Sequence, residues 1–156
     1  MLFMKKIIIT LLISSLLYSQ SMTENSLPLK ARNFINMNFP GNNIETVSLY
    51  QGTGGYEVNI DLGYKFIFYE TGLWKKISII SENDENTKNG IPRSCIHKSM
   101  VNVIDNEYPA SKITDIERKD KNFIIVLDNK YKIEISGYGI IISKENLEEN
   151  NNNNTN

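Results

Sequence analysis

Residues 27–40 read LPLKARNFINMNFP, and residues 96–109 read IHKSMVNVIDNEYP. The apolar residues of the first stretch stand four, three, one and four positions apart, which places them on one face of an α-helix. The second stretch repeats this spacing 69 positions further along, and both stretches end in an aromatic residue followed by proline, which stops a helix. The matched positions are Leu27, Ala31, Phe34, Ile35 and Phe39, and then Ile96, Met100, Val103, Ile104 and Tyr108. The simplest account is two copies of one unit.

After each helix, the period of the apolar residues changes from 3.6 to 2, which is typical of half-buried strands. The second copy follows the first at an offset of 67. The alternating positions are Tyr56, Val58, Ile60, Tyr64, Phe66 and Phe68 in the first copy, and Phe123, Ile125, Leu127, Tyr131, Ile133 and Ile135 in the second. Each copy is therefore predicted to be a helix followed by a meander of four strands.

Turn residues predict which strand residues face each other. With Gly63 at a positive φ in a three-residue loop, Ile60 lies opposite Tyr64 on the side that the helix covers. A tight turn at Thr71-Gly72 then pairs residues of the next two strands. It places Phe66 opposite Ile77 and Tyr64 opposite Ile79 on the helix side, and Ile67 opposite Lys76 and Tyr69 opposite Trp74 on the other side.

The pattern predicts an α+β fold of two tandem units, each with one helix and a four-stranded antiparallel meander sheet. One such unit of about 60 residues buries only about 60% of its unfolded surface, so we expect the two sheets to join edge to edge. The expected boundaries are a signal peptide at 1–21, unit one at 22–80, a polar linker at 81–90, unit two at 91–144 and a disordered, asparagine-rich tail at 145–156.

The first 21 residues have the order of a secretory signal. Two lysines precede an apolar stretch from Ile7 to Leu17, and small residues follow it. A membrane anchor is the alternative, but at about 1.5 Å per residue the stretch spans only about half of a ~30 Å hydrocarbon core. We therefore expect cleavage after Ser21, a periplasmic or secreted mature chain, and no stable membrane insertion after cleavage.

Composition excludes several classes of function. The chain of 156 residues has one cysteine and one histidine, which excludes a disulfide framework and a Cys/His zinc cluster. The formal net charge is −1 and becomes −3 when the two lysines of the signal are removed. A basic stripe that could neutralise phosphates is lacking, so we expect no nucleic-acid partner.

Several short motifs carry a resemblance to a known family. They are Leu27-Pro28, Phe39-Pro40-Gly41, Gly55-Tyr56-Glu57-Val58, Gly72-x-Trp74-Lys75, Ile91-Pro92-x-Ser94, Tyr108-Pro109, Ile116-Glu117 and Gly139. Over roughly residues 25–143 the sequence resembles the β-lactamase-inhibitor-like, PepSY-like family of bacterial envelope proteins. It departs from the pattern where Ile96-His97 replaces Leu-Pro and Ile141 replaces tryptophan. The resemblance implies tandem PepSY-like units in a β-lactamase-inhibitor-protein-like fold, export and a non-enzymatic binding role.

Two residue pairs invite a catalytic interpretation. Cys95 and His97 suggest a thiolate–imidazole pair, but side chains two positions apart on a helix point about 200° apart, and no oxyanion motif accompanies them. Glu57 and Asp61 suggest a glycosidase-type pair, but strand alternation places polar residues outward in any case. We therefore predict no catalytic residue.

Two segments invite a ligand-binding interpretation. The acidic residues at 82–85 could attract calcium, but they lack the ligand spacing of a calcium loop. The glycine-rich residues 52–55 suggest a phosphate loop, yet they precede a strand and carry no Lys-Ser/Thr. A solvated linker and a hairpin turn are the simpler interpretations, and we predict no metal site and no cofactor.

The sheet side away from the helices is the predicted binding site. Ile67, Tyr69 and Trp74 depart from the polar residues normal on a solvated face, and Tyr and Trp are preferred interface residues. The alternative is that these residues pack on the other unit, on the linker or on cross-strand neighbours. We expect a non-catalytic exported protein that binds an envelope or extracellular protein or peptide, as an inhibitor by analogy alone. A periplasmic small-ligand or metal-binding protein is the alternative function. The predicted partner-binding residues are Trp74, Tyr69, Ile67, Lys76, Glu57 and Lys65.

Overall fold

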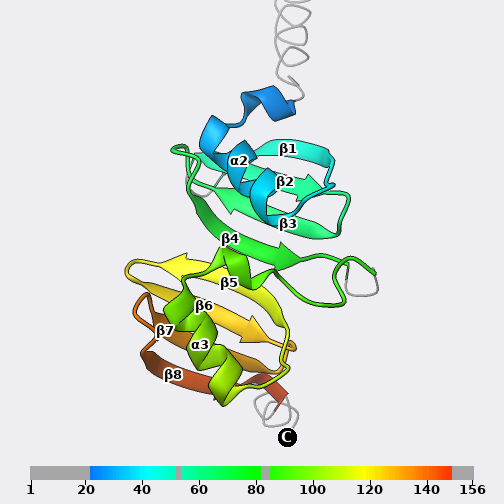
Figure 1. Cartoon of the computed structure of the whole chain (residues 1–156). Helices are drawn as coiled ribbons and strands as arrows, with labels where there is room; N and C mark the ends of the chain where they lie inside the picture. Colours follow the sequence, from blue (N-terminus) through cyan, green and yellow to red (C-terminus); the bar gives the residue numbers. More distant parts are fainter. Residues whose placement is uncertain (1–21, 52–53, 82–84, 149–156) are drawn as a thin grey trace, which may run out of the picture.

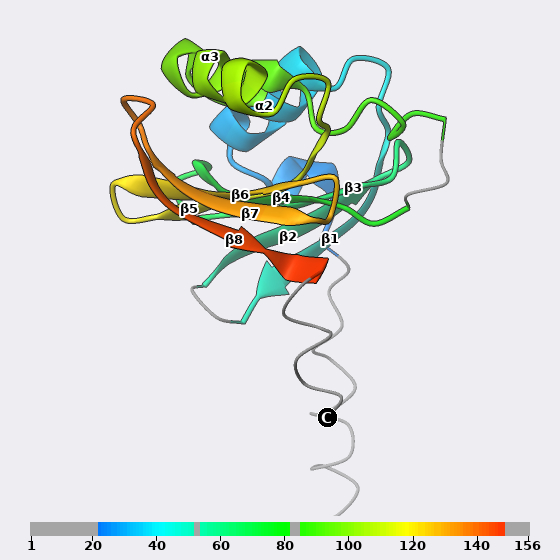
Figure 2. The same ribbon diagram turned by 90° about the horizontal axis from the view of Figure 1, so that it is seen from below.

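The computed structural model describes residues 22–51, 54–81 and 85–148. They form one eight-stranded antiparallel sheet whose strand order follows the sequence, with two α-helices on the same side of it (Figure 1 and Figure 2). Within these ranges no helix has the length and apolar character needed to cross a membrane. The predicted signal at 1–21 lies outside the described residues. The α+β class predicted from the sequence is confirmed.

A helix followed by four strands occurs twice along the chain. The first half contains η1 (Glu24–Ser26), α2 (Leu29–Asn38), β1 (Ile44–Tyr50), β2 (Gly55–Ile60), β3 (Tyr64–Phe68) and β4 (Trp74–Ile79). The second half contains η2 (Arg93–Cys95), α3 (Lys98–Glu107), β5 (Ile113–Lys119), β6 (Asn122–Leu127), β7 (Tyr131–Ser136) and β8 (Ile141–Asn146). Because β4 pairs with β5 at Lys76, Ile77 and Ser78, the eight strands form a single continuous sheet.

Each helix buries a narrow stripe against the sheet. Ile35 of α2 and Ile104 of α3 are fully buried, each one helical turn after a second buried residue. Phe34 and Val103, which the sequence pattern places at the centre of the stripe, are only partly buried. The apolar stripe is therefore centred one position further along each helix.

The register between β2 and β3 matches the sequence prediction. Ile60 pairs with Tyr64 and Val58 with Phe66, and Gly63 has a φ of +79° in the connecting turn. Glycine adopts this left-handed conformation at little cost, so the turn holds the large side chains of both strands on the helix side.

A β-bulge in β4 changes which side of the sheet Trp74 occupies. Ile67 pairs with Lys76 as predicted, but Phe68 pairs with Trp74, so Lys75 is an extra residue between the two pairs. Since side chains alternate along a strand, one extra residue turns Trp74 to the helix side. The predicted Tyr69–Trp74 pair is wrong. Equivalent register shifts occur in β8, β1 and β5, at Ile142, Glu45 and Thr114 respectively.

In both halves, a hairpin glycine packs against the start of the helix. Gly72 has a φ of +76°, and a Cβ there would lie 2.9 Å from Cβ of Pro28 and 3.1 Å from the backbone nitrogen of Ala31. Gly139 has a φ of +84°, and its Cβ would lie 2.6 Å from the carbonyl oxygen of Ser99. A larger residue at either position would force the β3–β4 or β7–β8 hairpin away from its helix.

Parts of the predicted linker and tail are packed against the sheet. The Tyr64 hydroxyl lies 3.0 Å from the carbonyl oxygen of Gly90, and Thr87 is only 2% exposed. At the other end, Glu145 pairs with Lys132 in the β7–β8 ladder, so β8 runs two residues into the segment predicted as a disordered tail. That prediction is wrong for Glu145 and Asn146, whose charged and polar neighbours conceal the strand pattern.

Candidate functional site

The side of the sheet turned away from α2 and α3, the open face, has no helix or strand of the described residues over it (Figure 2). The β2–β3 and β3–β4 registers place four of the six predicted binding residues there, namely Glu57, Lys65, Ile67 and Lys76. Tyr69 lies just after the last residue of β3.

Ion pairs across strands organise the charges of the open face. Nζ of Lys65 lies 3.2 Å from a carboxylate oxygen of Glu57. Nζ of Lys76 lies 3.2 Å from Asp115, whose carboxylate also accepts a 2.7 Å hydrogen bond from the Ser78 hydroxyl. The second of these pairs crosses from β4 to β5, so it joins the two halves of the sheet. These contacts therefore hold the four charged side chains in place on the sheet.

The apolar residues of the open face are less exposed than predicted. Ile67 is only 8% exposed, because it stands directly between Glu57 on one neighbouring strand and Lys76 on the other. Long charged side chains cover apolar neighbours with their aliphatic stems while the charged ends stay in water. Tyr69 is partly exposed. The open face thus offers a charged surface around a covered isoleucine, and not the predicted aromatic pair.

Trp74 belongs to the core instead of the open face. It is 4% exposed, and its ring centroid lies 6.1 Å from that of Phe34 and 6.0 Å from that of Phe123. The prediction that Trp74 is an exposed interface residue is wrong, because the bulge at Lys75 turns its side chain to the helix side.

A groove on the helix side was not predicted from the sequence. Its volume is about 670 Å³, and it runs between α2, the β3–β4 hairpin, η2 and β5. Its main lining residues are Leu29, Lys30, Phe34, Met37, Trp74 and Arg118. We call it the Arg118 groove.

Arg118 contributes a charged side chain to the groove and lies against two aromatic rings. Its guanidinium carbon lies 3.9 Å from the ring centroid of Trp74 and 5.0 Å from that of Phe123. Burial lowers the pKa of the guanidinium, and no described residue accepts a hydrogen bond from its buried Nε. The sequence does hold a signal for it: Arg118 stands two positions after buried Ile116, which puts an arginine on the inward side of β5.

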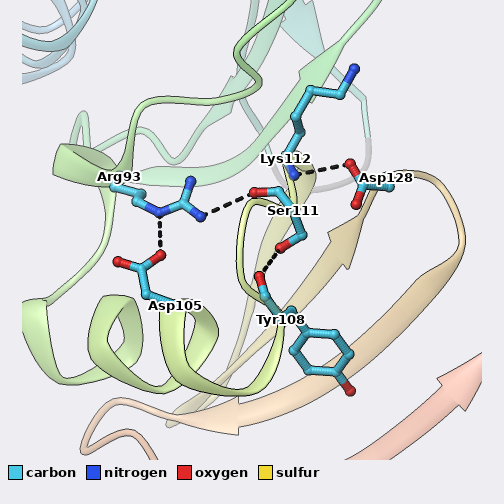
Figure 3. A network of polar contacts seen from close by, with 6 residues as sticks. All are labelled: Arg93, Asp105, Tyr108, Ser111, Lys112 and Asp128. Atoms are coloured by element: carbon cyan, nitrogen blue, oxygen red, sulfur yellow. Dashed lines mark hydrogen bonds and ion pairs between the residues drawn. The ribbon is translucent and has the colours of Figure 1, made fainter.

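Hydrogen bonds fix η2, which supplies Ser94 to the groove, against α3 and the loop after it (Figure 3). Nε of Arg93 donates a 2.7 Å hydrogen bond to Asp105, and its Nη2 donates a 3.0 Å bond to the carbonyl oxygen of Ser111. The Ser111 hydroxyl donates in turn to the carbonyl oxygen of Tyr108. This network holds η2 in position, and its charged side chains Arg93 and Asp105 are paired with each other.

Cys95 and His97 do not face each other. Cys95 is buried in η2, and burial raises the pKa of its thiol to about 12. His97 is exposed and precedes α3, where its Nδ1 lies 3.3 Å from the backbone nitrogen of Ser99 and caps the helix. A neutral buried thiol and a capping imidazole cannot form a nucleophile and its base.

Metal ligands do not gather among the residues that the structure describes. No group of three or more His, Cys, Asp or Glu side chains there could hold an ion. The acidic segment at 82–85 and the glycine-rich segment at 52–55 lie partly outside the described ranges.

Comparison with known proteins places this arrangement in a family. Residues 54–143 match the family model described as "Putative beta-lactamase-inhibitor-like, PepSY-like". The chain belongs to this PepSY-like family. The family predicted from the sequence motifs is therefore confirmed. Among curated proteins no match is found.

Solved structures share the PepSY-like fold of this chain. A "putative periplasmic protein" of the DUF2874 family from Bacteroides vulgatus has 22% identity and a TM-score of 0.68, over 81% of this chain and 96% of that one. A "putative calcium-regulated periplasmic protein" from Bacteroides thetaiotaomicron has 21% identity and a TM-score of 0.69, over 81% and 95%. At this identity the likeness establishes the fold. Neither the family description nor these two descriptions names an enzymatic activity.

Proposed function

We propose that this PepSY-like chain is an exported, non-catalytic protein that binds an envelope or extracellular protein through the open face of its sheet. The observation that carries the proposal is the uncovered face itself. It spans all eight strands, and two ion pairs on it, Glu57–Lys65 and Lys76–Asp115, already link neighbouring strands. Such pre-ordering lowers the entropy lost when a partner binds.

The size of the open face suits a protein partner. Eight strands about 4.8 Å apart and about six residues long give a face of roughly 34 by 20 Å, or about 700 Å². A standard protein interface buries about 800 Å² on each side, whereas small molecules need an enclosing cavity. The ion pairs would determine which charge pattern the partner must present, more than they would supply raw affinity.

Export is supported by the signal-like order of residues 1–21 and by the periplasmic descriptions of the structural neighbours. A non-catalytic role is supported by the buried Cys95 thiol, with its pKa of about 12, and by the capping duty of His97. The metal-binding alternative has no support from the described residues, which hold no cluster of three possible ligands.

We also propose that the sheet consists of two copies of one helix-and-four-strand unit that meet between β4 and β5. The proposal is supported by the matching bulges at Lys75 and Ile142 and by the matching hairpin glycines, Gly72 and Gly139. An exchange of the two hairpins, each with its bulge and glycine, should give a folded protein with wild-type circular dichroism.

A charge swap tests the binding proposal without removing an ion pair. In a Glu57→Lys/Lys65→Glu variant the pair is kept and its direction is reversed, so the stability should change by less than about 1 kcal/mol. The matched control is Glu107→Lys/Lys144→Glu, which reverses the exposed ion pair between α3 and β8 on the helix side. Each mature protein is immobilised and incubated with envelope extract from the source bacterium.

The proposal expects wild type and control to retain one stoichiometric protein that the open-face swap loses. Equal retention by all three proteins would show that the partner contacts another surface. Loss in the control alone would place the binding surface on the helix side.

A further inference from the structure

Arg118 is a half-buried cation with no anionic partner among the residues that the structure describes. Its guanidinium lies against the rings of Trp74 and Phe123, and none of the ion pairs among the described residues includes it. Its Nε is buried and donates to no described acceptor. A half-buried charge loses part of its hydration, and an anion that binds the accessible end of the guanidinium would offset that loss.

The surroundings of Arg118 favour a ligand that is both apolar and anionic. Leu29 is 63% exposed and Met37 is 81% exposed, and both line the groove, so both side chains are open to contact with a ligand. Lys30 adds a second cation, and no acidic residue is found among the described residues that line the groove. The groove therefore combines positive charge with apolar surface, which favours a ligand that carries both an anionic group and apolar groups.

We propose that the Arg118 groove binds a peptide segment that presents a carboxylate next to apolar side chains. The planar guanidinium of Arg118 receives the carboxylate through paired hydrogen bonds, and Leu29 and Met37 contact the apolar side chains. This site lies on the opposite side of the sheet from the open face and does not depend on the function proposed for that face.

The shape of the groove decides in favour of a peptide over a fatty acid. A small amphiphile binds well when 70–90% of its surface is enclosed, and this groove is open along α2. From Leu29 to Met37 the helix rises about 12 Å, which matches about four residues of extended peptide. Met37 suits such a surface because methionine adapts its shape to different apolar partners.

Trp74 makes the proposal directly measurable, because it is the single tryptophan of the chain and lines the groove. The probe is an acetylated, amidated pentapeptide of four leucines around a central aspartate. Its matched control has asparagine in place of aspartate, and a third probe is dodecanoate. Each is titrated into the mature protein while the Trp74 emission is followed.

The aspartate peptide should shift the emission and bind about tenfold or more tightly than the asparagine peptide. Arg118→Met should abolish that difference, and Arg118→Lys, which keeps the charge but not the planar fork, should remove most of it. Lys119→Met is the control, since it removes the same charge from the next residue of β5, which is exposed. It should bind like wild type.

Three results would overturn the proposal. The first is equal affinity for the two peptides, or no change in Trp74 emission up to about 1 mM peptide, the weak end of specific binding. The second is a peptide difference that persists in a folded Arg118 variant. The third is tighter binding of dodecanoate than of the aspartate peptide, which would assign the groove to a lipid. If neither Arg118 variant folds, the comparison of peptides on wild type still decides.

Discussion

Replacing Trp74 by alanine should lower the free energy of unfolding by about 3–5 kcal/mol. The side chain is 4% exposed and packs between Phe34 and Phe123. Its removal therefore leaves a cavity under α2, near the pairing of β4 with β5. For a folded part of about 125 residues, a loss of 4 kcal/mol lowers Tm by roughly 15 °C. Tyr69→Ala, which removes a partly exposed side chain, should cost about 1 kcal/mol or less.

Urea unfolding followed by far-ultraviolet circular dichroism measures both variants, because the signal does not depend on the tryptophan. Trp74→Phe is the matched control and should recover part of the loss, since it keeps an aromatic ring beside Phe34. A Trp74→Ala protein within about 0.5 kcal/mol of wild type, together with a strongly destabilised Tyr69→Ala protein, would refute the bulge at Lys75. The hairpin would then follow the simple alternation.

Hydrogen bonds from Asn43 lower the pKa of Asp61 in the folded protein. The ionised Asp61 carboxylate therefore stabilises the fold above its unfolded pKa of about 3.8, and this stabilisation is lost as the pH falls through the lower folded pKa. Asp61→Asn should therefore weaken the dependence of the urea midpoint on pH between about pH 5 and 2. Because burial raises the pKa of Cys95 from 9.0 to about 12, folded protein should hold roughly a thousandfold less thiolate than unfolded protein. Its reaction with a thiol reagent should thus track global unfolding; rapid labelling in native buffer would contradict the burial. Gly139→Ala should destabilise by more than Gly41→Ala, because both have positive φ but only Gly139 would bring a Cβ against another backbone, as denaturant midpoints can check.

Local spacing was enough to predict the elements, the β2–β3 register and the β3–β4 register as far as the bulge. The alternation around Val58 and Phe66, together with a glycine at position 63, determines the β2–β3 pairing. Such information is local, because it depends on side-chain parity and on the conformational freedom of one residue. The same reasoning found both helices from their apolar stripes.

The candidate site was harder to predict, because single extra residues change the parity of a strand. Nothing in the segment Trp74-Lys75-Lys76 marks which residue is the bulge, and the error moved Trp74 to the wrong side of the sheet. Ile67 is covered by Glu57 and Lys76, which lie on the neighbouring strands β2 and β4, and the exposure of Ile67 therefore cannot be judged from its own strand alone. The inward position of Arg118 follows from its parity with Ile116, but its contact with Trp74 requires the pairing of β4 with β5.

Site-specific photo-crosslinking on the mature chain tests the proposed open-face function most directly. A photoreactive residue is placed at Ser48 of β1 or at Ser143 of β8, both exposed on the open face, or at Asn102, exposed on α3. In the native envelope, Ser48 and Ser143 should cross-link to the same protein and Asn102 should not. Adducts at Asn102 alone, or equal adducts at all three positions, would contradict binding through the open face.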